Sequence, residues 1–501
     1  MSELNRSCDV LVIGGGGSGL TAGCRAASLG KSVIVLEKTR NLGGGMNSAS
    51  TMRTFGSKWQ KERNLPDTSM LYLRNRMDET FWRIDRKLAA NVIRGTGEFF
   101  DWFCDIAPKE YLDYFKIGRY VFDEESDGPL GPQSERGPGS KGSGRIFVEV
   151  FSQKLLELGG EILTEAITED VIVENGRITA AVVRQGDDTI TISCGAVILA
   201  CGAWIRNPEI VGKYYPQLLD AQPYMGESPH QAHSYTGDGL TIAKKAGADM
   251  DTVNLTIRMM GPMTMCRSRV LGGMSSSPYS IYVNKNGERF VCEVSQLRMG
   301  VFDSGSVVVE QPEGKSYVIF DEVGIRRTIE NGDDQPKPQV AMPPMMAPSF
   351  PKDLEEALAD VQAGLEDPNV VKCDTIEELA AALEVPFDAL SKTLSDYNAA
   401  CETGMDWDCC KPAEWLQPIQ APYYAVKASL GTDGAFGGVN ITPEFQAKAA
   451  AGGAVKGLYV VGDLASGRFI NMAGIKKQIL NDMSFALSSG FQAGTNAAAS
   501  L

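Results

Sequence analysis

The first apolar stretches of the chain are separated by a glycine turn and a run of small residues. An unbroken apolar run covers residues 10–13 and leads into four glycines. Ala22, Ala26 and Ala27 then recur at helical spacing, and the β-branched stretch SVIVLE resumes a strand pattern. The pattern therefore predicts a strand, a helix and a second strand, which together form a β-α-β unit.

The glycine turn has the spacing G-x-G-x-x-G, at Gly14, Gly16 and Gly19. Glycine lets the backbone approach a pyrophosphate, and N–H groups at the start of the following helix stabilise its negative charge. Glu37 stands eighteen residues after Gly19 at the end of the second strand, where its carboxylate can accept hydrogen bonds from a ribose diol. Any glycine-rich turn matches the spacing, but strand, helix, second strand and acid all agree here. We therefore expect a dinucleotide site, and the acid disfavours NADP.

Three later segments favour FAD over NAD. The stretch NLGGGMNSAS (41–50) follows the acid closely and offers flexible backbone and small hydroxyl groups, which a lone NAD site does not need. AVILACGAW (196–204) is a further buried strand that ends in small residues, and GLYVVGDLA (457–465) is another that places Asp463 just after a glycine. Each segment alone reads as a tight turn, but together and in this order they predict an FAD site.

Composition and charge narrow the class of protein. The 501 residues are 43% hydrophobic and 22% charged, which is ordinary for a globular protein of at least two domains. A net charge of −15 argues against binding to nucleic acid or to an anionic membrane. The chain shows no leader-like N-terminus and no apolar run of membrane-spanning length, so we expect a cytoplasmic protein without a membrane span.

The eleven cysteines are scattered along the chain, without a CxxC pair or the regular spacing of an iron–sulfur cluster motif. Only Cys409 and Cys410 are adjacent. We expect reduced thiols and no metal site, although a small metal or cluster site assembled from distant cysteines stays open.

The middle of the chain contains signals for a hairpin, a loop and two helices. Asn286 and Gly287 form a turn signal within IYVNKNGERF, and the Pro/Met-rich passage 333–351 predicts an irregular loop. Residues 375–404 read as two helices, with Thr375 as the N-cap of the first and Glu378 completing a capping box.

Five further segments carry a family resemblance: SYTGDGLTIAKKAGA (234–248), IYVNKNGERFVCE (281–293), SYVIFDE (316–322), APYYAV (421–426) and GAFGGVNIT (434–442). With the glycine motifs, they make nearly the whole chain resemble an FAD-dependent family that includes fumarate reductase and succinate dehydrogenase flavoproteins and the 3-ketosteroid dehydrogenases. The resemblance implies an α/β fold, in which an α+β capping domain is inserted into a Rossmann-like FAD-binding domain. The implied bounds are 1–235 and 425–501 for the FAD-binding domain and 236–424 for the capping, or substrate, domain.

The motifs and the resemblance together assign a set of cofactor-binding residues. These are Gly14, Gly16, Gly17, Ser18, Gly19, Glu37, Lys38, Gly43, Gly44, Gly45, Met46, Asn47, Ser48, Ala200, Gly202, Asp238, Gly462, Asp463, Lys476, Lys477 and Ile479. The segment from 41 onward has no histidine where covalently flavinylated relatives attach the ring, so we expect noncovalent FAD. Lys476 or Lys477 would lie near flavin N1, where a positive charge raises the flavin potential; the alternative is a solvated helix start.

The resemblance also implies the chemistry, which is hydride exchange between flavin and a C=C bond conjugated to a carbonyl or carboxylate. Fumarate-reducing members clamp two carboxylates with histidines and arginines. This chain has two histidines in total, and Arg258, Met259 and Met260 stand where the family has its cap histidine. Residues 432–436, which end in Phe436, stand where the family has a histidine pair before its C-terminal glycines, here Gly437 and Gly438. A small dicarboxylate would therefore lose most of its clamp.

Several polar residues remain as candidates for moving a proton. Arg326 and Arg327 resemble the segment that carries the family's proton-donating arginine, and Arg298 stands near the relay arginine, each one residue out of register. Ketosteroid members use tyrosines instead, and Tyr279 or Tyr424 can donate a proton or bind a ketone oxygen. A surface or packing role is the alternative for each of these side chains.

The segment RMMGPMTMC (258–266) contains four methionines in nine residues. Methionine fills irregular gaps in cores and also lines adaptable apolar pockets. Because Met259 or Met260 replaces a polar clamp, we expect both, with Phe436 and Gly437, to contact a bulky and largely apolar substrate, such as a steroid-like or polycyclic enone.

The leading hypothesis is an FAD-dependent reductase or dehydrogenase that acts on such an enone. One alternative is a fumarate-reductase-like flavoprotein for a small unsaturated carboxylate, and another is the flavoprotein subunit of a larger electron-transfer complex. A third is an enzyme, such as a hydratase, that uses FAD without redox chemistry. No second G-x-G-x-x-G and no haem motif is visible, so we expect an external electron donor or acceptor beside the small-molecule substrate.

Overall fold

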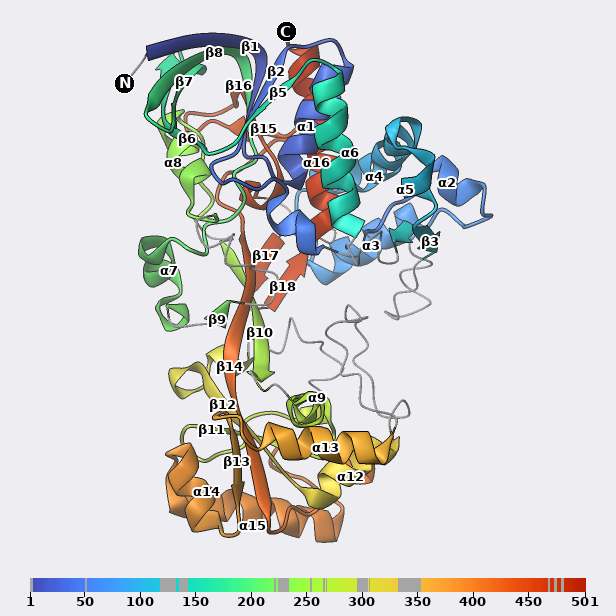
Figure 1. Cartoon of the computed structure of the whole chain (residues 1–501), viewed down its shortest axis with the longest axis vertical. Helices are drawn as coiled ribbons and strands as arrows, with labels where there is room; N and C mark the ends of the chain where they lie inside the picture. The colour runs from blue at the N-terminus through green and yellow to red at the C-terminus, as the bar shows by residue number, and fades with distance from the viewer. Residues whose placement is uncertain are drawn as a thin grey trace. The chain divides into compact units, whose positions relative to one another are not determined.

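Figure 1 shows a computed structural model of the chain. The structure describes residues 3–49, 52–117, 132–134, 143–219, 222–223, 234–252, 255–264, 266, 268–294, 305, 307–331, 353–466, 469–472, 475–478 and 482–501. The chain divides into two compact units. The first unit comprises Met1–Val211, Met225–Ile257 and Gly434–Leu501, and the second comprises Gly212–Tyr224 and Arg258–Asp433.

These bounds differ in detail from those expected for the two domains. Helix α8 (Asp238–Lys245) belongs to the first unit, although the capping domain was expected to begin at residue 236. The assignment of the first unit to FAD and of the second unit to the substrate stays a prediction.

An eight-stranded sheet forms the centre of the first unit. Its strands are β1 (Glu3–Ile13), β2 (Val33–Leu36), β5 (Glu161–Leu163), β6 (Ala166–Glu174), β7 (Arg177–Gln185), β8 (Asp188–Leu199), β15 (Gln446–Lys448) and β16 (Ala454–Val460). In the order β16-β8-β1-β2-β5 all neighbours are parallel, whereas β15, β7 and β6 form antiparallel pairs. All four residues of β2 are buried, as expected for a parallel strand that is covered on both faces.

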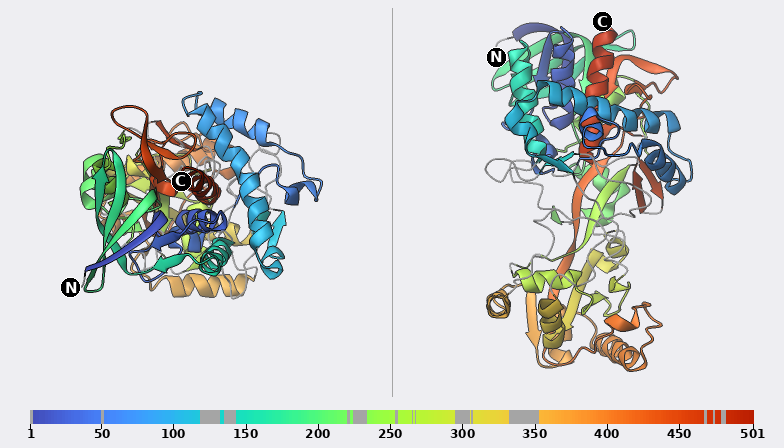
Figure 2. Two further views of the ribbon diagram at one scale, coloured as in Figure 1. Left: turned by 90° about the horizontal axis from the view of Figure 1, so that it is seen from above. Right: turned by 90° about the vertical axis from the view of Figure 1, so that its right-hand side faces the viewer.

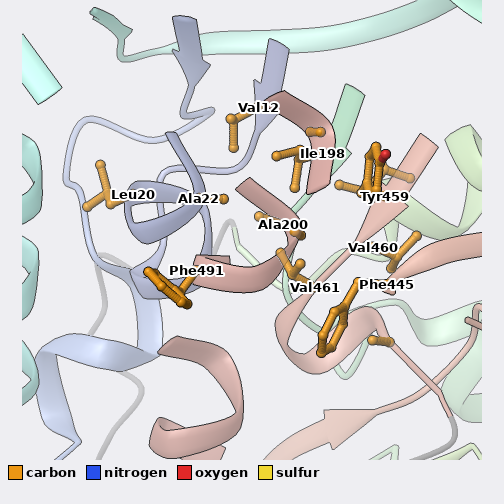
Figure 3. Close-up of a cluster of buried hydrophobic side chains, with 14 of the residues drawn as sticks. Val12, Leu20, Ala22, Ile198, Ala200, Phe445, Tyr459, Val460, Val461 and Phe491 are labelled. Carbon is orange, nitrogen blue, oxygen red and sulfur yellow. The ribbon is translucent and has the colours of Figure 1, made fainter. Parts of the chain in front are cut away.

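Three helices lie side by side against this sheet, α1 (Gly17–Ser28), α6 (Ser143–Glu157) and α16 (Asp482–Ala499) (Figures 1 and 2). Helices α1 and α16 approach closely because small residues face each other, and a Cβ atom on Gly494 would lie 2.5 Å from the Ala22 carbonyl oxygen. Figure 3 shows the core beneath them, where Leu20 of α1 and Phe491 of α16 join apolar side chains of the sheet. The last helix of the chain therefore supports the first β-α turn.

The other elements of the first unit surround this core. They are η1 (Gly44–Ser48), α2 (Lys58–Lys61), α3 (Ser69–Glu79), α4 (Arg86–Ile106), α5 (Lys109–Leu112), β3 (Phe115–Ile117), β4 (Pro132–Ser134), η9 (Gly462–Leu464), β17 (Phe469–Met472) and β18 (Ile475–Gln478). Helix α7 (Pro208–Tyr214) follows β8 and crosses the boundary between the units at Val211, and η3 (Pro216–Leu218) belongs to the second unit. Aromatic packing joins α4 to α6, with the rings of Phe103 and Phe147 4.5 Å apart.

The second unit is built on a six-stranded sheet of order β10-β14-β12-β11, in which β13 and β9 also pair with β14. Its strands are β9 (Gln222–Pro223), β10 (Thr256–Thr264), β11 (Ile281–Asn284), β12 (Lys315–Asp321), β13 (Val370–Cys373) and β14 (Tyr423–Phe436). Its helices are α9 (Arg269–Gly273), η5 (Met274–Ser276), η6 (Pro312–Gly314), α12 (Glu322–Asn331), α13 (Leu354–Gly364), α14 (Ile376–Leu383), α15 (Phe387–Thr403) and η8 (Ala413–Trp415).

Both faces of the second sheet are covered. Successive side chains of a strand point to opposite faces, so Val318 and Phe320 of β12 join a core with α9, α12 and α13, whereas Tyr317 and Ile319 join a core with α14 and α15. Every residue of β12 after Lys315 is buried as a result.

Several predictions about elements are confirmed. The α/β fold with a parallel sheet is present, and Thr375 and Glu378 form the expected capping box at the start of α14. The expected loop at 333–351 lies outside the described residues. Within the described part of the chain, none of the helices has both the length and the apolar character that a membrane crossing requires.

Candidate cofactor-binding and active site

The predicted nucleotide turn lies between β1 and α1 of the first unit, and two of its glycines have no room for a side chain. Gly14 has φ +113°, and a Cβ atom there would overlap the Ala200 carbonyl oxygen. A Cβ atom on Gly19 would overlap the Gly14 carbonyl oxygen. These two glycines therefore let the helix start close against the ends of β1 and β8.

The remaining glycine of the motif, Gly16, is different because the space next to its Cα atom is open. The nearest atom to a Cβ on Gly16 would be the Gly43 carbonyl oxygen at 3.9 Å, and a Cβ on Gly44 would come no closer than 3.9 Å to Gly16 Cα. Gly16 and Gly43 also form an isolated parallel bridge. The two glycine-rich segments thus lie side by side without side chains between them, as the approach of a pyrophosphate requires.

The start of α1 suits a negative charge. Gly16 is the N-cap, no side chain caps the helix, and the first turn contains no acidic residue. The helix dipole and the N–H groups of the first turn therefore remain for an anion. Of the expected cofactor residues, Gly17 and Ser18 form the first residues of this helix, and both are buried.

Glu37 lies at the end of β2, where the sequence placed it, and its carboxylate reaches the glycine turn. Oε2 accepts a hydrogen bond from the Gly15 N–H at 3.0 Å, and Oε1 accepts hydrogen bonds from the N–H and the hydroxyl of Thr39 at 2.8 Å each. A carboxylate has about four lone-pair sites, so these bonds fix its orientation and leave capacity for a ribose hydroxyl.

Lys38 connects the second strand to the TGDG motif. Its Nζ donates hydrogen bonds to the Thr236 hydroxyl and, at 2.8 Å, to Asp238 Oδ2, and the same hydroxyl donates to Asp238 Oδ1 at 2.7 Å. Asp238 is the first residue of α8, after Gly237 in the left-handed region. The structure therefore brings together Lys38 and Asp238, two of the expected cofactor residues, as an ion pair.

The expected flavin loop, which contains Gly45, Met46 and Asn47, packs against the same turn. Met46 is buried beside Gly17, and the Asn47 side-chain amide donates to the Leu42 carbonyl oxygen at 2.8 Å. Ser48 ends η1, and nothing of its side chain is described.

Tyr235 is a neighbour of this loop that the motifs did not single out. Its hydroxyl would lie 2.6 Å from a Cβ on Gly45, and its ring lies beside Gly202. It has φ +62°, a conformation that non-glycine residues seldom adopt. The only sequence signal that could have pointed to Tyr235 was its position just before the TGDG motif.

The C-terminal glycine-acid motif closes the site from the other side. Gly462 has φ +65°, and a Cβ there would lie 2.7 Å from the Ser18 hydroxyl. The Asp463 carbonyl oxygen accepts a hydrogen bond from the Gly437 N–H at 2.8 Å, and the Gly437 carbonyl oxygen accepts one from the Trp204 indole at 3.2 Å. Gly437, an expected substrate residue, is thus joined to an expected cofactor residue, and its neighbour Phe436 is buried.

Other expected residues are described only in part or not at all. Lys476 and Lys477 lie in β18, and Met259 and Met260 lie in β10, but their side chains are outside the described atoms. Arg298 and Ile479 lie outside the described residues.

The second unit brings two of the catalytic candidates together. The Arg327 guanidinium on α12 lies over the Tyr279 ring, 5.6 Å from its centroid, and Trp415 packs edge-on against that ring at 5.9 Å. Arg326 and Arg327 are both exposed, whereas Tyr279 is buried. The guanidinium is therefore accessible while its aromatic support is fixed.

Tyr424 has different neighbours. Its hydroxyl donates to Glu322 Oε1 at 3.1 Å, and the Lys372 ammonium lies 5.2 Å from its ring centroid. Burial raises the pKa of Tyr424, although a hydrogen bond with Lys372 opposes the shift. Its ring is stacked on Phe320 in the core, so its expected catalytic role stays a prediction.

A buried ionic network in the second unit was not foreseen. The Arg289 guanidinium binds both oxygens of Glu293 and both oxygens of Asp406, at 3.0 to 3.1 Å. Lys411 Nζ lies 3.6 Å from Glu293 and donates to the Tyr397 hydroxyl at 3.1 Å. Burial lowers the pKa of Lys411, whereas the pKa of Arg289 is raised because its two carboxylates outweigh burial. Arg289 and Glu293 lie in the segment IYVNKNGERFVCE (281–293), which carried the family resemblance and was the only sequence signal for this network.

All eleven cysteines are free thiols. Over the ranges that the structure describes, no group of three or more His, Cys, Asp or Glu side chains is arranged to hold a metal ion.

The two glycine segments around Gly16 and Gly44 lie within the residues that a known family model matches. The family model described as an FAD binding domain matches residues 9–473. The chain belongs to this FAD binding domain family. FAD is therefore the cofactor of this chain, and the open space at Gly16 and Gly44 would accommodate its pyrophosphate.

Curated relatives of this FAD-binding protein include several oxidoreductases. An NADH:acrylate oxidoreductase of Vibrio harveyi is 27% identical over 93% of this chain and 48% of its own length. A vinyl phenol reductase of Lactiplantibacillus plantarum is 25% identical over 92% of this chain and 90% of its own length. The chain thus spans about half of the first relative and most of the second. Fumarate reductases and a 3-oxosteroid 1-dehydrogenase are also among the relatives.

A solved structure shares the fold of this FAD-binding protein. A 3-ketosteroid delta1-dehydrogenase of Sterolibacterium denitrificans matches with a TM-score of 0.70 at 18% identity, covering 99% of this chain and 100% of that chain. The resemblance to fumarate reductases and ketosteroid dehydrogenases, the fold and the FAD-dependent oxidoreductase class are confirmed.

Proposed function

We propose that the chain is a reductase or dehydrogenase that uses noncovalent FAD and acts on a C=C bond conjugated to a carbonyl. The assignment of the cofactor site rests on the two glycine segments at Gly16 and Gly44, which leave room for a ligand beside the start of α1. The relatives support the reaction class, because acrylate and vinyl phenol both contain a C=C bond and their enzymes are named as an oxidoreductase and a reductase.

Bound FAD supplies the hydride chemistry. The N–H groups at the start of α1 would stabilise the charge of its pyrophosphate, and Glu37 would accept hydrogen bonds from its ribose. Lys38 and Asp238 hold the end of β2 to the start of α8, so they position the nucleotide-binding backbone.

For the proton, the contacts favour Arg327 over the other candidates. The Tyr279 ring supports its guanidinium by a cation–π contact, and the side chain is exposed enough to meet a ligand. Arg298, Arg326, Tyr279 and Tyr424 are the alternatives. The contact with the Tyr279 ring would keep the Arg327 guanidinium oriented toward a substrate without a further hydrogen bond.

We further propose a bulky and largely apolar substrate, such as a steroid-like or polycyclic enone. Support comes from Met259, Met260 and Phe436, which replace the histidines of the carboxylate clamp. A 3-oxosteroid 1-dehydrogenase among the relatives, 25% identical over 91% of this chain, agrees with this class. Acrylate and vinyl phenol are smaller, and fumarate-like acids are the second candidate.

The test of both proposals is the anaerobic reoxidation of the reduced, FAD-loaded protein. A 3-keto-4-ene steroid such as 4-androstene-3,17-dione should reoxidise the flavin stoichiometrically, and fumarate should give negligible turnover with reduced viologen as the donor. Brisk fumarate reduction would overturn the apolar substrate. Failure of every enone and unsaturated acid to reoxidise the flavin would overturn the reductase itself and favour FAD chemistry without redox.

A variant at the methionine pair tests the substrate contact directly. Met259→His should lower turnover of the preferred enone about tenfold, because an imidazole desolvated against an apolar substrate without a partner costs about 1–3 kcal/mol. Met259→Leu is the matched control and should keep most of the activity. Equal activity of the two variants would place this side chain away from the substrate.

The electron partner and the location stay predictions. We propose an external donor or acceptor, either a small molecule or a protein. Copurification of an iron–sulfur or cytochrome subunit would favour the alternative of a flavoprotein subunit in a larger complex. A cytoplasmic location agrees with the expected role and is tested by fractionation of the native host.

A further inference from the structure

Two cysteines that are distant in sequence meet on the surface of the second unit. The Cys292 thiol donates to the carbonyl oxygen of Cys410 at 3.7 Å, across 118 residues of chain. Because a carbonyl oxygen lies about 2.4 Å from the Cα atom of its own residue, Cys410 Cα is within about 6 Å of the Cys292 sulfur. A disulfide spans Cα atoms about 4.4–6.8 Å apart. The Cα atom of Cys292 lies about 2.8 Å from its own sulfur, so the two Cα atoms are at most about 9 Å apart, and rotation of both side chains with a movement of the exposed turn at Cys410 brings the sulfurs together.

The buried ionic network holds both segments in place. Cys292 stands between Arg289 and Glu293 in the sequence, and these two residues are bound to each other by two hydrogen bonds. On the other segment, Asp406 Oδ2 accepts from the Lys411 N–H at 3.0 Å, and the Asp406 carbonyl oxygen accepts from the N–H of Cys410 at 3.0 Å. Since Arg289 also binds Asp406, the thiol contact is built into the packing and does not depend on a chance encounter of two loops.

Cys410 differs from the other thiols nearby. It is exposed and has φ +57°, which places it at a sharp turn. Burial raises the pKa of the adjacent Cys409 to about 12, and burial also raises the pKa of Cys401. A thiol must be deprotonated to attack a disulfide, so these two neighbours react slowly.

We propose that Cys292 and Cys410 form an intrachain disulfide when the protein meets a low-molecular-weight disulfide such as glutathione disulfide. The Cys410 thiolate attacks one sulfur of glutathione disulfide, forming a mixed disulfide and releasing one glutathione. The Cys292 thiolate then attacks the Cys410 sulfur and releases the second glutathione. Two protein thiols are oxidised, one glutathione disulfide is reduced to two glutathiones, and the two thiol protons end on these products.

A pair of thiols fits the site better than a metal ion does. The described residues include no arrangement of three or more His, Cys, Asp or Glu side chains around a possible ion. The inference concerns the second unit alone and does not depend on the proposed substrate.

The experiment uses the full-length, FAD-loaded protein with glutathione disulfide as the oxidant. Remaining thiols are alkylated, and peptides are mapped by mass spectrometry without reduction. The expected product is a cross-link between the peptide 290–298, which holds Cys292 as its only cysteine, and the peptide that contains Cys410. The reduced protein should show no such link.

Serine variants assign the partners. Cys292→Ser and Cys410→Ser should each abolish the cross-link, whereas Cys409→Ser should keep it, and Cys373→Ser in β13 is a matched control that should also keep it. Exclusive linkage of Cys409 to Cys410, or mixed disulfides with glutathione alone, would overturn the proposal. Equal thermal unfolding of reduced wild type and reduced Cys292→Ser confirms that loss of the link does not reflect misfolding.

Discussion

Replacing Arg289 with Met is expected to destabilise the second unit by about 3 kcal/mol. The guanidinium side chain is 1% exposed and donates two hydrogen bonds to Glu293 and two to Asp406. Met keeps much of the apolar volume but leaves two buried carboxylates without their main cation, and such a loss costs about 3–5 kcal/mol. We place the value at the lower end because Lys411 Nζ, 3.6 Å from Glu293, still compensates part of the charge.

Hydrogen exchange with mass spectrometry measures this loss within the second unit. Peptides from α15 and β11 should exchange faster in Arg289→Met, while peptides of the first unit should not change. The matched control is Arg269→Met, which removes an exposed ion pair with Glu356 in the same unit and should cost less than about 1 kcal/mol. Equal exchange in the two variants would refute the reasoning.

The acid dependence of stability gives an independent check on the same network. Burial opposes ionisation of Asp406, but the hydrogen bonds from Arg289 hold the pKa of this carboxyl below its usual value of 3.8. A carboxylate with a lowered pKa in the folded state contributes stability above its unfolded pKa, and the contribution is lost as the pH falls through the folded pKa. The difference between wild type and Arg289→Met should therefore shrink below about pH 4, and a constant difference down to about pH 2 would contradict this cause.

Three further predictions concern the first unit. Gly16→Val should leave the unloaded fold intact, since no atom lies closer than 3.9 Å to a Cβ there, but it should abolish FAD loading. Full flavin absorbance of the purified variant would contradict the assignment of the pyrophosphate to the space at Gly16 and Gly44. Lys38→Met should lower FAD retention during gel filtration, because the ion pair with Asp238 and the hydrogen bond to Thr236 that hold the start of α8 contribute about 1 kcal/mol. Unchanged retention would show that this ion pair does not support FAD binding. Replacing both Lys476 and Lys477 with Met should lower the flavin potential in a dye-coupled reductive titration while FAD stays bound, and an unchanged midpoint would place both lysines away from flavin N1.

Local patterns were sufficient to predict the nucleotide end of the chain. The apolar run before Gly14, the glycine spacing and the acid at Glu37 each act within a few residues of the sequence, and the structure contains the predicted strand, turn, helix and strand. The capping box of α14 is equally local, since its two hydrogen bonds join Thr375 and Glu378. Such signals need no knowledge of the rest of the fold.

Contacts between distant segments were not predictable in the same way. Arg289 meets Asp406 across 117 residues, and nothing near either residue marks it as the partner of the other. Tyr235 adopts a left-handed backbone and lies beside Gly45 of the flavin loop, 190 residues earlier in the chain. The methionine segment at 258–266 gave a pattern compatible with core and with pocket, and the side chains of residues 258–265 lie outside the described atoms.

The order of the first sheet has a consequence for synthesis on the ribosome. Strand β8 pairs with β1 on one side and with β7 and β16 on the other, and α1 packs against α16. The early elements β1 and α1 therefore wait for β16 and α16, which are made much later. At about 5–20 residues per second, translation from the end of β1 to the start of α16 takes about 20 to 90 s. Throughout that time the face of α1 that packs against α16 has no cover, and once β8 is made the edge of its last residues lacks β16. We therefore expect the nascent chain to depend on chaperones, and FAD to be captured only after α16 has been made.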